Sequence, residues 1–315
     1  MNASSAGGSS FIACAVPKRP LPLTLSAVSP MLARRTTGPG DNSRVEGVGG
    51  VAEHINGPLH WERLGKMGRP IAFVHFTPAD HSSFVFQMDH LSTWFQCIGI
   101  DLPGFGKSPT AQPGFTIADL AQACWEAVDE VTDQPAILVG ISTGSSVVRF
   151  MAHQRPERAL AIVMSGGGRS YRPSAEHQRI PAYQERGLGF RYEHILEEYS
   201  PTFRESPQGR YFARLFAERN PWADLPTIIE LFRALRQPRP DWLDSGLKAP
   251  TLLITGSLDA SHEQAFAHQA RIPGAELVTI EGGGHACHME KPWEWDAYFL
   301  RFLARHDLFE RILDA

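Results

Sequence analysis

The stretch "ILVGISTGSSVV", residues 137–148, runs from apolar residues into a serine with a glycine two positions away on each side, then continues with small and β-branched residues. Gly140 and Gly144 leave room for a turn that is too tight for larger side chains around Ser142. Such a turn between a strand and a helix lifts a hydroxyl above the sheet and brings the backbone N–H of Thr143 near a developing oxyanion. A glycine-rich loop would show the same letters, but the strand, turn and helix context favours a nucleophilic serine.

A serine hydroxyl is a weak nucleophile at neutral pH, so this interpretation requires a general base and a carboxylate that orients it. Two later apolar segments supply them. The segment at 250–256 is followed by Asp259, and the segment at 275–282 is followed by glycines and His285. Because parallel strands bring their carboxyl ends to one edge of a sheet, we expect Ser142, Asp259 and His285 to meet there as a catalytic triad.

Each partner has an alternative role. Asp259 is also well placed to cap a helix that begins near Ser261, because aspartate is a common helix cap. His288 is a second candidate for the base, although its place closer to the following helix favours a structural hydrogen bond. His285, Cys287 and His288 match no metal-ligand spacing, so we predict no metal site.

The rest of the chain alternates apolar segments with helical patterns, which is typical of a mostly parallel sheet covered by helices. The predicted strands lie at 70–76, 97–103, 135–140, 159–166, 250–256 and 275–282. The segment 116–133 predicts a helix with Thr116 as its cap and one apolar stripe. Residues 169–246 show no strand pattern and indicate helices separated by prolines, hence an inserted helical cap, or lid, between two parts of an α/β core at 45–168 and 247–315.

Residues 1–44 are rich in Ser, Ala, Gly and Pro, and the first acidic residue is Asp41. This composition predicts a disordered leader outside the core. A basic, serine-rich segment that is poor in acidic residues is also typical of an organelle transit peptide, and a start codon upstream of a true Met31 would give the same result. We therefore expect a cytoplasmic protein, or an organellar one if the leader directs transport.

The composition excludes several classes of protein. With 43% hydrophobic and 20% charged residues the chain is typical of a globular protein, and no apolar run is long enough for a membrane span. The formal net charge is -4 and the basic residues are dispersed, so nucleic acid is not an expected partner. Four cysteines without a C-x-x-C pair favour buried free thiols and a reducing compartment. A small-molecule substrate is the expected partner, and the oligomeric state stays open.

Four motifs together resemble the α/β-hydrolase family, in particular its lid-bearing serine hydrolases of esterase and lactonase type. They are Gly140 to Gly144, "DLPGFGKS" at 101–108, Asp259 behind "LLITG", and "GGHACHMEKP" at 283–292. The resemblance implies an eight-stranded, mostly parallel sheet, an inserted helical cap and no cofactor. Serine at position 142 excludes relatives that use aspartate there to form alkyl-enzyme esters.

One motif departs from the family. Members usually carry His-Gly after the first central strand, whereas this sequence has Phe76 after His75. By position, Thr77 corresponds to the residue that donates the second oxyanion N–H, so Thr77 and Thr143 are the expected oxyanion hole. Phe76, and also Ile141 beside the nucleophile, are expected substrate-binding residues.

The leading hypothesis is a serine hydrolase that cleaves a carboxylic ester or lactone of a small to medium apolar substrate through an acyl-enzyme. Aromatic residues in the cap favour an apolar pocket. Carbon–carbon bond hydrolases share the triad but often carry tryptophan soon after the histidine, where this chain has Ala286. A proline iminopeptidase would need an acidic amine-binding site in the cap, for which Glu193, Glu197 and Glu198 are available. From other classes, a ligand receptor or a cofactor-free oxygenase on the same fold stays open.

Overall fold

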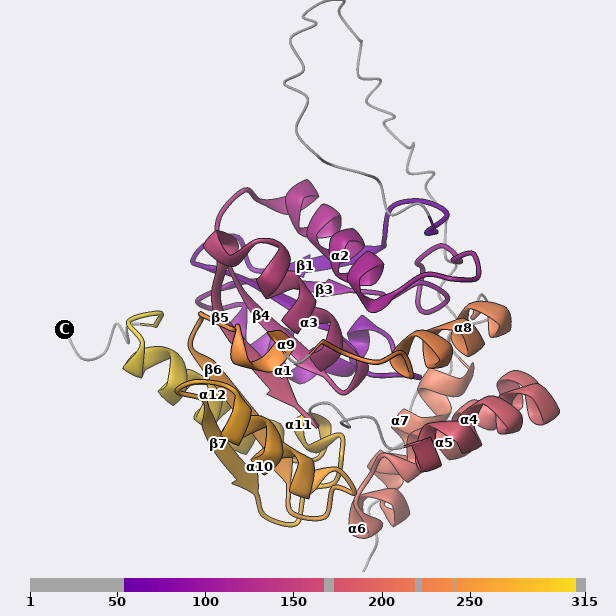
Figure 1. Ribbon diagram of the computed structural model, residues 1–315. Coiled ribbons are helices and arrows are strands. Elements are labelled where there is room, and N and C mark those ends of the chain that lie inside the picture. The colour runs from indigo at the N-terminus through magenta and orange to yellow at the C-terminus, as the bar shows by residue number, and fades with distance from the viewer. Residues whose placement is uncertain (1–53, 167–172, 219–222, 241, 310–315) are drawn as a thin grey trace, which may run out of the picture. The chain divides into compact units, whose positions relative to one another are not determined.

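The fold centres on a seven-stranded sheet with the strand order β1-β3-β2-β4-β5-β6-β7 (Figure 1). The computed structural model describes residues 54–166, 173–218, 223–240 and 242–309. The strands are β1 (Trp61–Leu64), β2 (Pro70–Val74), β3 (Gln96–Ile100), β4 (Ala136–Ile141), β5 (Ala159–Ser165), β6 (Thr251–Gly256) and β7 (Glu276–Ile280). Only β1 pairs antiparallel, with β3, and the other neighbours pair in parallel. The predicted α/β-hydrolase architecture is confirmed, while the predicted leader, 1–44, lies outside the described residues.

The sheet differs from the prediction at one edge. All six predicted strands are present, and β1 is an additional strand that the sequence pattern did not reveal. Ahead of β1, Ile55 makes a single isolated bridge to Ala111 and no ladder. Within the described residues the sheet therefore has seven strands, one fewer than the resemblance implied.

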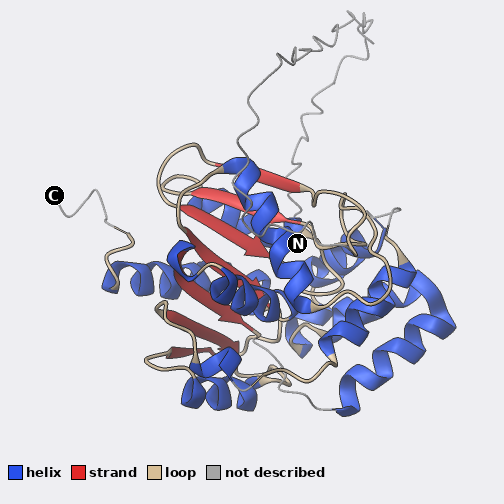
Figure 2. Cartoon of the chain, turned by 45° about the horizontal axis from the view of Figure 1, so that its top comes forward, coloured by secondary structure: helices blue, strands red, loops and turns tan. Residues whose placement is uncertain are grey.

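Both faces of the sheet are covered, which explains the nearly continuous apolar character of its central strands. Successive residues of a strand point to opposite faces, so Ala72 and Val74 join one buried cluster while Ile71 and Phe73 join the other. Figure 2 shows helices on the two sides of the strands. The core helices are α1 (Val85–Leu91), α2 (Ile117–Val131), α3 (Thr143–Gln154), α10 (His262–Arg271), α11 (Cys287–Glu290) and α12 (Pro292–Arg305), with short 3-10 helices η1 (His81–Phe84) and η2 (Pro156–Arg158).

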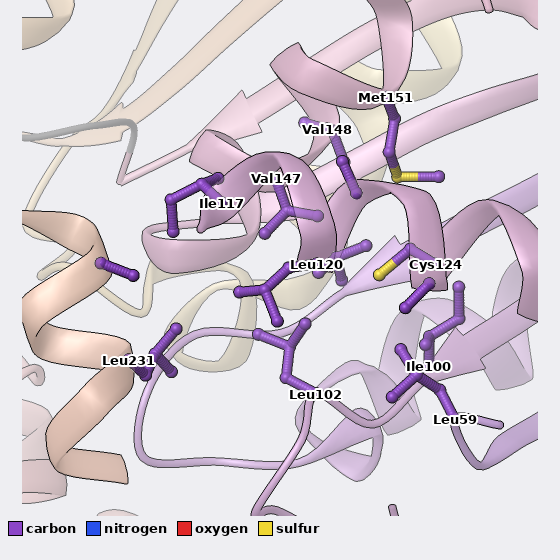
Figure 3. Packing of buried hydrophobic residues seen from close by; sticks show 14 of the residues in the cluster. Leu59, Ile100, Leu102, Ile117, Leu120, Cys124, Val147, Val148, Met151 and Leu231 are labelled. Atoms are coloured by element: carbon purple, nitrogen blue, oxygen red, sulfur yellow. The ribbon is translucent and has the colours of Figure 1, made fainter. Parts of the chain in front are cut away.

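Helix α2 illustrates how local sequence sets the core. Thr116 caps it in a capping box, in which the Thr116 hydroxyl accepts from the Asp119 N–H and Asp119 accepts from the Thr116 N–H. Its predicted stripe is buried from Ile117 to Val128, and Val131 at its end is only partly buried. Figure 3 shows Leu120 and Cys124 of this stripe among the side chains of α3 and the loop after β3.

Between β5 and β6 the described residues contain helices and no strand, and we call this segment the helical insertion. Its elements are α4 (Pro173–Arg186), η3 (Gly187–Phe190), α5 (Arg191–Glu197), α6 (Pro201–Glu205), α7 (Pro207–Glu218), α8 (Leu225–Leu235) and α9 (Trp242–Ser245). Helix α8 joins the core through Leu231, which lies in the same cluster as Leu102 (Figure 3). A hydrogen bond of 3.1 Å from the Ala111 N–H to the Thr227 hydroxyl adds a polar attachment.

The described helices are all too short or too polar to cross a bilayer. Cys97, Cys124 and Cys287 are buried free thiols, as expected from the absence of C-x-x-C spacing.

Candidate active site

Ser142 occupies the sharp turn between β4 and α3. Its backbone φ is 51° and ψ is -106°, and among the described non-glycine residues only Ser142 and Asp307 have a positive φ. A Cβ at Gly140 would lie 2.3 Å from the Gly144 carbonyl carbon, and a Cβ at Gly144 would lie 1.9 Å from the Val74 oxygen. Neither position accepts a larger residue, so the two glycines allow a strained turn whose cost is on the order of 1–3 kcal/mol.

Asp259 and His285 meet at the carboxyl ends of β6 and β7. The His285 Nδ1 and the Asp259 Oδ1 are 2.9 Å apart, and both residues are buried. Asp259 also accepts hydrogen bonds from the Ser261 N–H at 2.7 Å and from the Ser261 hydroxyl at 2.8 Å. Burial opposes the charge of Asp259, but His285 and the Ser261 bonds outweigh it and lower the pKa of the carboxyl below its ordinary value. The carboxylate is therefore ionised at neutral pH and orients His285.

The alternative role considered for Asp259 was that of cap of the helix that begins near Ser261, but Asp259 is not the N-cap residue of this helix. Helix α10 begins after Ser261, whose side chain makes no capping bond. Asp259 receives the Ser261 N–H in the loop before this helix and directs the same oxygen to His285.

Ser142 and His285 line one pocket of about 500 Å³, its solvent-open mouth included. Thr77 and Thr143 line the same pocket, and their hydroxyl oxygens are 3.0 Å apart. The two residues predicted for the oxyanion hole thus lie side by side next to the serine. Thr143 is the first residue of α3, where the N–H groups of the first turn have no partner within the helix and favour negative charge.

Phe76 and Ile141 lie elsewhere. Both side chains are fully buried, and neither belongs to the pocket lining. The Phe76 ring packs edge-on against His288, with 5.8 Å between ring centroids. Burial, with a smaller effect of His285, lowers the pKa of His288 to about 3. His288 is therefore a neutral residue of the interior and is absent from the pocket lining.

The pocket lining differs from the predicted apolar one. Nine of its eleven residues carry polar or charged side chains, and Phe232 and Leu235 are the other two. Most of the aromatic residues that suggested an apolar pocket pack elsewhere, as Phe212 and Phe216 do in a stacked pair within α7. The full lining is Thr77, Ser142, Thr143, Ser146, Arg179, His194, Glu198, Phe232, Leu235, Arg239 and His285.

Among the lining residues that the sequence analysis did not select are Arg179, His194 and Arg239. They come from the helical insertion, where no motif marks them. The spacing of His194 and Glu198, four residues apart on a helical segment, is a weak signal that the two side chains meet. Sequence reasoning selected Glu198 only as one of three acidic residues for amine binding. Of the other two, Glu193 pairs with Arg186 and Glu197 pairs with Arg179, and neither lines the pocket.

The loop after β3 stabilises the region next to the site. Asp101 accepts hydrogen bonds from the N–H groups of His81 and Lys107, at 2.8 and 3.0 Å. A Cβ at Gly106, where φ is 53°, would collide with the Asp101 carboxylate. The next residue, Leu102, donates its N–H to His75 Nε2 at 2.9 Å. The "DLPGFGKS" motif therefore fixes the end of β2, from which Thr77 reaches the pocket.

Among the described residues, one group brings possible metal ligands together. Single ligand atoms of His60, His81 and Asp101 lie within 4.8 Å of one another. Glu62 and Lys107 complete this cluster with ion pairs, so its charges are balanced by protein groups. The group lies apart from the pocket lining.

Comparison with known proteins identifies the family. Residues 56–295 match the alpha/beta hydrolase family, and the chain belongs to it. The AB hydrolase superfamily protein YisY of Bacillus subtilis is 27% identical over 264 residues, which cover 79% of this chain and 96% of YisY.

Two solved structures illustrate the likeness in fold. The enol-lactonase from Burkholderia xenovorans has a TM-score of 0.72 at 19% identity, covering 79% of this chain and 98% of that one. A thermophilic esterase from Thermogutta terrifontis has a TM-score of 0.69 at 26% identity, covering 79% and 93%. These neighbours and the family assignment support a hydrolase.

Proposed function

We propose that the protein is a serine hydrolase that cleaves a carboxylic ester or a lactone through an acyl-enzyme on Ser142. One observation carries the proposal: a buried Asp259–His285 pair opens onto the pocket in which Ser142 occupies a strained turn. The similarity to an enol-lactonase and an esterase supports the same reaction class.

In the proposed reaction His285 takes the Ser142 proton as the hydroxyl oxygen attacks the substrate carbonyl. Asp259 stabilises the imidazolium that forms, and the N–H groups of Thr77 and Thr143 receive the oxyanion. Collapse of the tetrahedral intermediate transfers the proton from His285 to the leaving alkoxide. Water, activated by the same histidine, then cleaves the acyl-enzyme and restores Ser142.

The pocket narrows the class of substrate. We place the apolar part of a small to medium ester or lactone against Phe232 and Leu235. The remaining walls are lined mostly by polar and charged side chains, among them Arg179, Glu198 and Arg239, so they accommodate a polar part of the substrate. We therefore propose a substrate with both an apolar and a polar part, in place of the wholly apolar one that the aromatic residues suggested.

The test is turnover of a panel of p-nitrophenyl esters and lactones by the wild-type protein and by Ser142→Ala. Loss of the nucleophile should reduce kcat about a million-fold, because the remaining triad residues act only through the serine. A fluorophosphonate should add one covalent group to the wild type by intact mass and none to the variant. Activity that survives the substitution would reject the acyl-enzyme. Absence of turnover and of adduct would favour a receptor.

A second candidate is a proline iminopeptidase, and the carboxylate of Glu198 in the pocket favours it. Such an enzyme needs an anion that receives the substrate ammonium. Hydrolysis of prolyl 4-nitroanilide with a kcat/KM above that of the best ester would establish this activity. Turnover of esters without turnover of the anilide would exclude it.

A further inference from the structure

Each of the two ring nitrogens of His285 has a carboxylate close to it. Asp259 lies on Nδ1, and the Glu198 Oε2 lies 3.6 Å from Nε2. Nε2 is the atom that takes the proton from Ser142 in the proposed reaction. Glu198 comes from the end of α5 in the helical insertion, so the second carboxylate belongs to a different part of the fold from the first.

The approach of Glu198 to His285 is fixed by the backbone. The Ala286 N–H donates to the Glu198 carbonyl oxygen at 3.0 Å. Glu290 Oε1 accepts from the N–H groups of Ser200 and Gly284, at 3.1 and 3.2 Å, and so joins the residues that follow Glu198 to those that precede His285. A Cβ at Gly284 would lie 2.3 Å from the Ser200 nitrogen, so this close contact requires glycine.

The orientation of the Glu198 carboxylate is also fixed. Its Oε1 receives a hydrogen bond from Arg179 Nη2 at 2.8 Å and lies 3.3 Å from His194 Nε2. The Nδ1 of His194 is 2.9 Å from the Tyr183 hydroxyl oxygen. With Oε1 held in this way, Oε2 faces His285. Burial opposes the charge of Glu198, but His285, His194 and Arg179 hold its pKa well below the ordinary value, so the carboxylate stays ionised.

We propose that Glu198 is a positioning residue that sets the pH range of catalysis, because its charge stabilises protonated His285 and competes with Ser142 for the Nε2 proton. This inference rests on the proposed function, in which His285 is the base. At 3.6 Å the contact between Glu198 Oε2 and His285 Nε2 is longer than a hydrogen bond. An opposite charge at this distance favours the charged form of its partner.

The other groups around His285 do not replace this effect. Asp259 and the Ser261 hydroxyl, 3.5 Å from Nδ1, face the opposite nitrogen. His288 is neutral at the pH of catalysis, and burial raises the pKa of Cys287 to about 12, so that thiol is neutral as well. Burial also raises the pKa of Glu290, whose Oε1 is used by two backbone donors. His194 and Arg179 act on His285 through Glu198, because both contact its Oε1.

The test compares Glu198→Gln with the wild type over the pH range of about 5 to 9, using kcat/KM for p-nitrophenyl acetate. Glutamine keeps the shape and removes the charge. The pH of half-maximal activity should fall by about one unit or more. At acid pH the variant should be faster than the wild type, because a larger fraction of its His285 is neutral and able to act as base. At alkaline pH it should be slower, because a weaker base accepts the Ser142 proton less readily. A purely structural role would lower both limbs together, and parallel profiles would overturn the proposal.

Glu197→Gln is the matched control. Glu197 is adjacent and binds the same Arg179, but it is exposed and lies outside the pocket lining. Its pH profile should match the wild type, and a shift as large as that of Glu198→Gln would also overturn the proposal. Glu198→Asp retains the charge but moves it away from His285 by the length of one methylene, so its pH profile should lie between those of the wild type and Glu198→Gln. This variant also tests the proposal if Glu198→Gln folds poorly.

A second readout does not depend on turnover. NMR titration of ¹³C-histidine-labelled protein, with His285→Gln to assign the signal, should give a lower midpoint for His285 in Glu198→Gln than in the wild type. An unchanged midpoint contradicts the role of Glu198. A shifted midpoint in a protein that forms no fluorophosphonate adduct instead contradicts the serine hydrolase proposal, so the two failures are distinguishable.

Discussion

Two histidines in this protein, His81 and His285, each lie between two carboxylates, but only His285 lines the pocket with Ser142. His81 Nδ1 is 2.7 Å from the Asp101 Oδ1 and its Nε2 is 3.4 Å from Glu62, while His285 Nδ1 is 2.9 Å from Asp259 and its Nε2 is 3.6 Å from Glu198. Even the outer glutamates correspond, since Lys107 binds the second oxygen of Glu62 at 2.7 Å and Arg179 binds that of Glu198 at 2.8 Å.

The difference is what lies beside each histidine. His285 shares a pocket with a serine in a strained turn, whereas His81 lies beneath the half-exposed pair of Glu62 and Lys107. A histidine between two carboxylates is therefore no evidence of catalysis by itself. The neighbouring serine and the access to a pocket make His285, but not His81, a candidate base.

The largest effect after loss of Ser142 should come from Asp259→Asn. An asparagine keeps the shape but favours the wrong tautomer of His285, so kcat should fall about 10,000-fold. Steady-state kinetics on the best p-nitrophenyl ester would measure the loss. Asp101→Asn, the corresponding change at His81, should leave kcat per folded molecule within a few-fold of the wild type. A similar loss of kcat in both variants would end the distinction between the two histidines.

Removal of His81 should instead cost stability. His81→Leu leaves the buried Asp101 without its side-chain partner, and breaking a buried pair costs about 3 kcal/mol. Burial opposes the charge of His81, but Asp101 raises the pKa of the histidine above its ordinary value. The pair therefore stabilises the fold fully below the ordinary histidine pKa and loses this contribution as pH rises through the raised one.

Urea unfolding of the wild type and His81→Leu at mildly acid and at alkaline pH would check this. The difference in unfolding free energy between the two proteins should be larger at acid pH. His60→Leu, which removes a partly exposed neighbour from the same cluster, should cost less. A difference that grows with pH would show that His81 is neutral in the fold.

The parts of the molecule also differ in how far they could be predicted from the sequence. Ser142, Asp259 and His285 were predictable because each follows an apolar strand, and parallel pairing alone brings the strand ends to one edge. The exposed edge strand β1 was missed because only four residues form it and its last two are exposed. The place of Glu198 was not predictable, because it depends on how the helical insertion packs on the loop before His285.

The apolar pocket was predicted for a reason that the packing overturns. An aromatic residue in a helix indicates burial but does not indicate what buries it. Tyr183, Phe190 and Phe232 pack against one another and around His194 inside the insertion. Phe232 alone of these reaches the pocket lining, where polar side chains predominate.

The smallest effect should come from Lys107→Ala, which tests whether the outer cation matters at His81. The hydrogen bond from Lys107 is the main cause that lowers the pKa of Glu62 to about 2. Both side chains are about half exposed, however, so solvent screens the pair and its loss should change the unfolding free energy by less than about 1 kcal/mol. The effect should also disappear in high salt, since exposed charge pairs are screened. Arg179→Ala removes the corresponding cation from the buried Glu198 and should be more costly at every salt concentration. Equal costs for the two variants would mean that burial does not separate the two clusters.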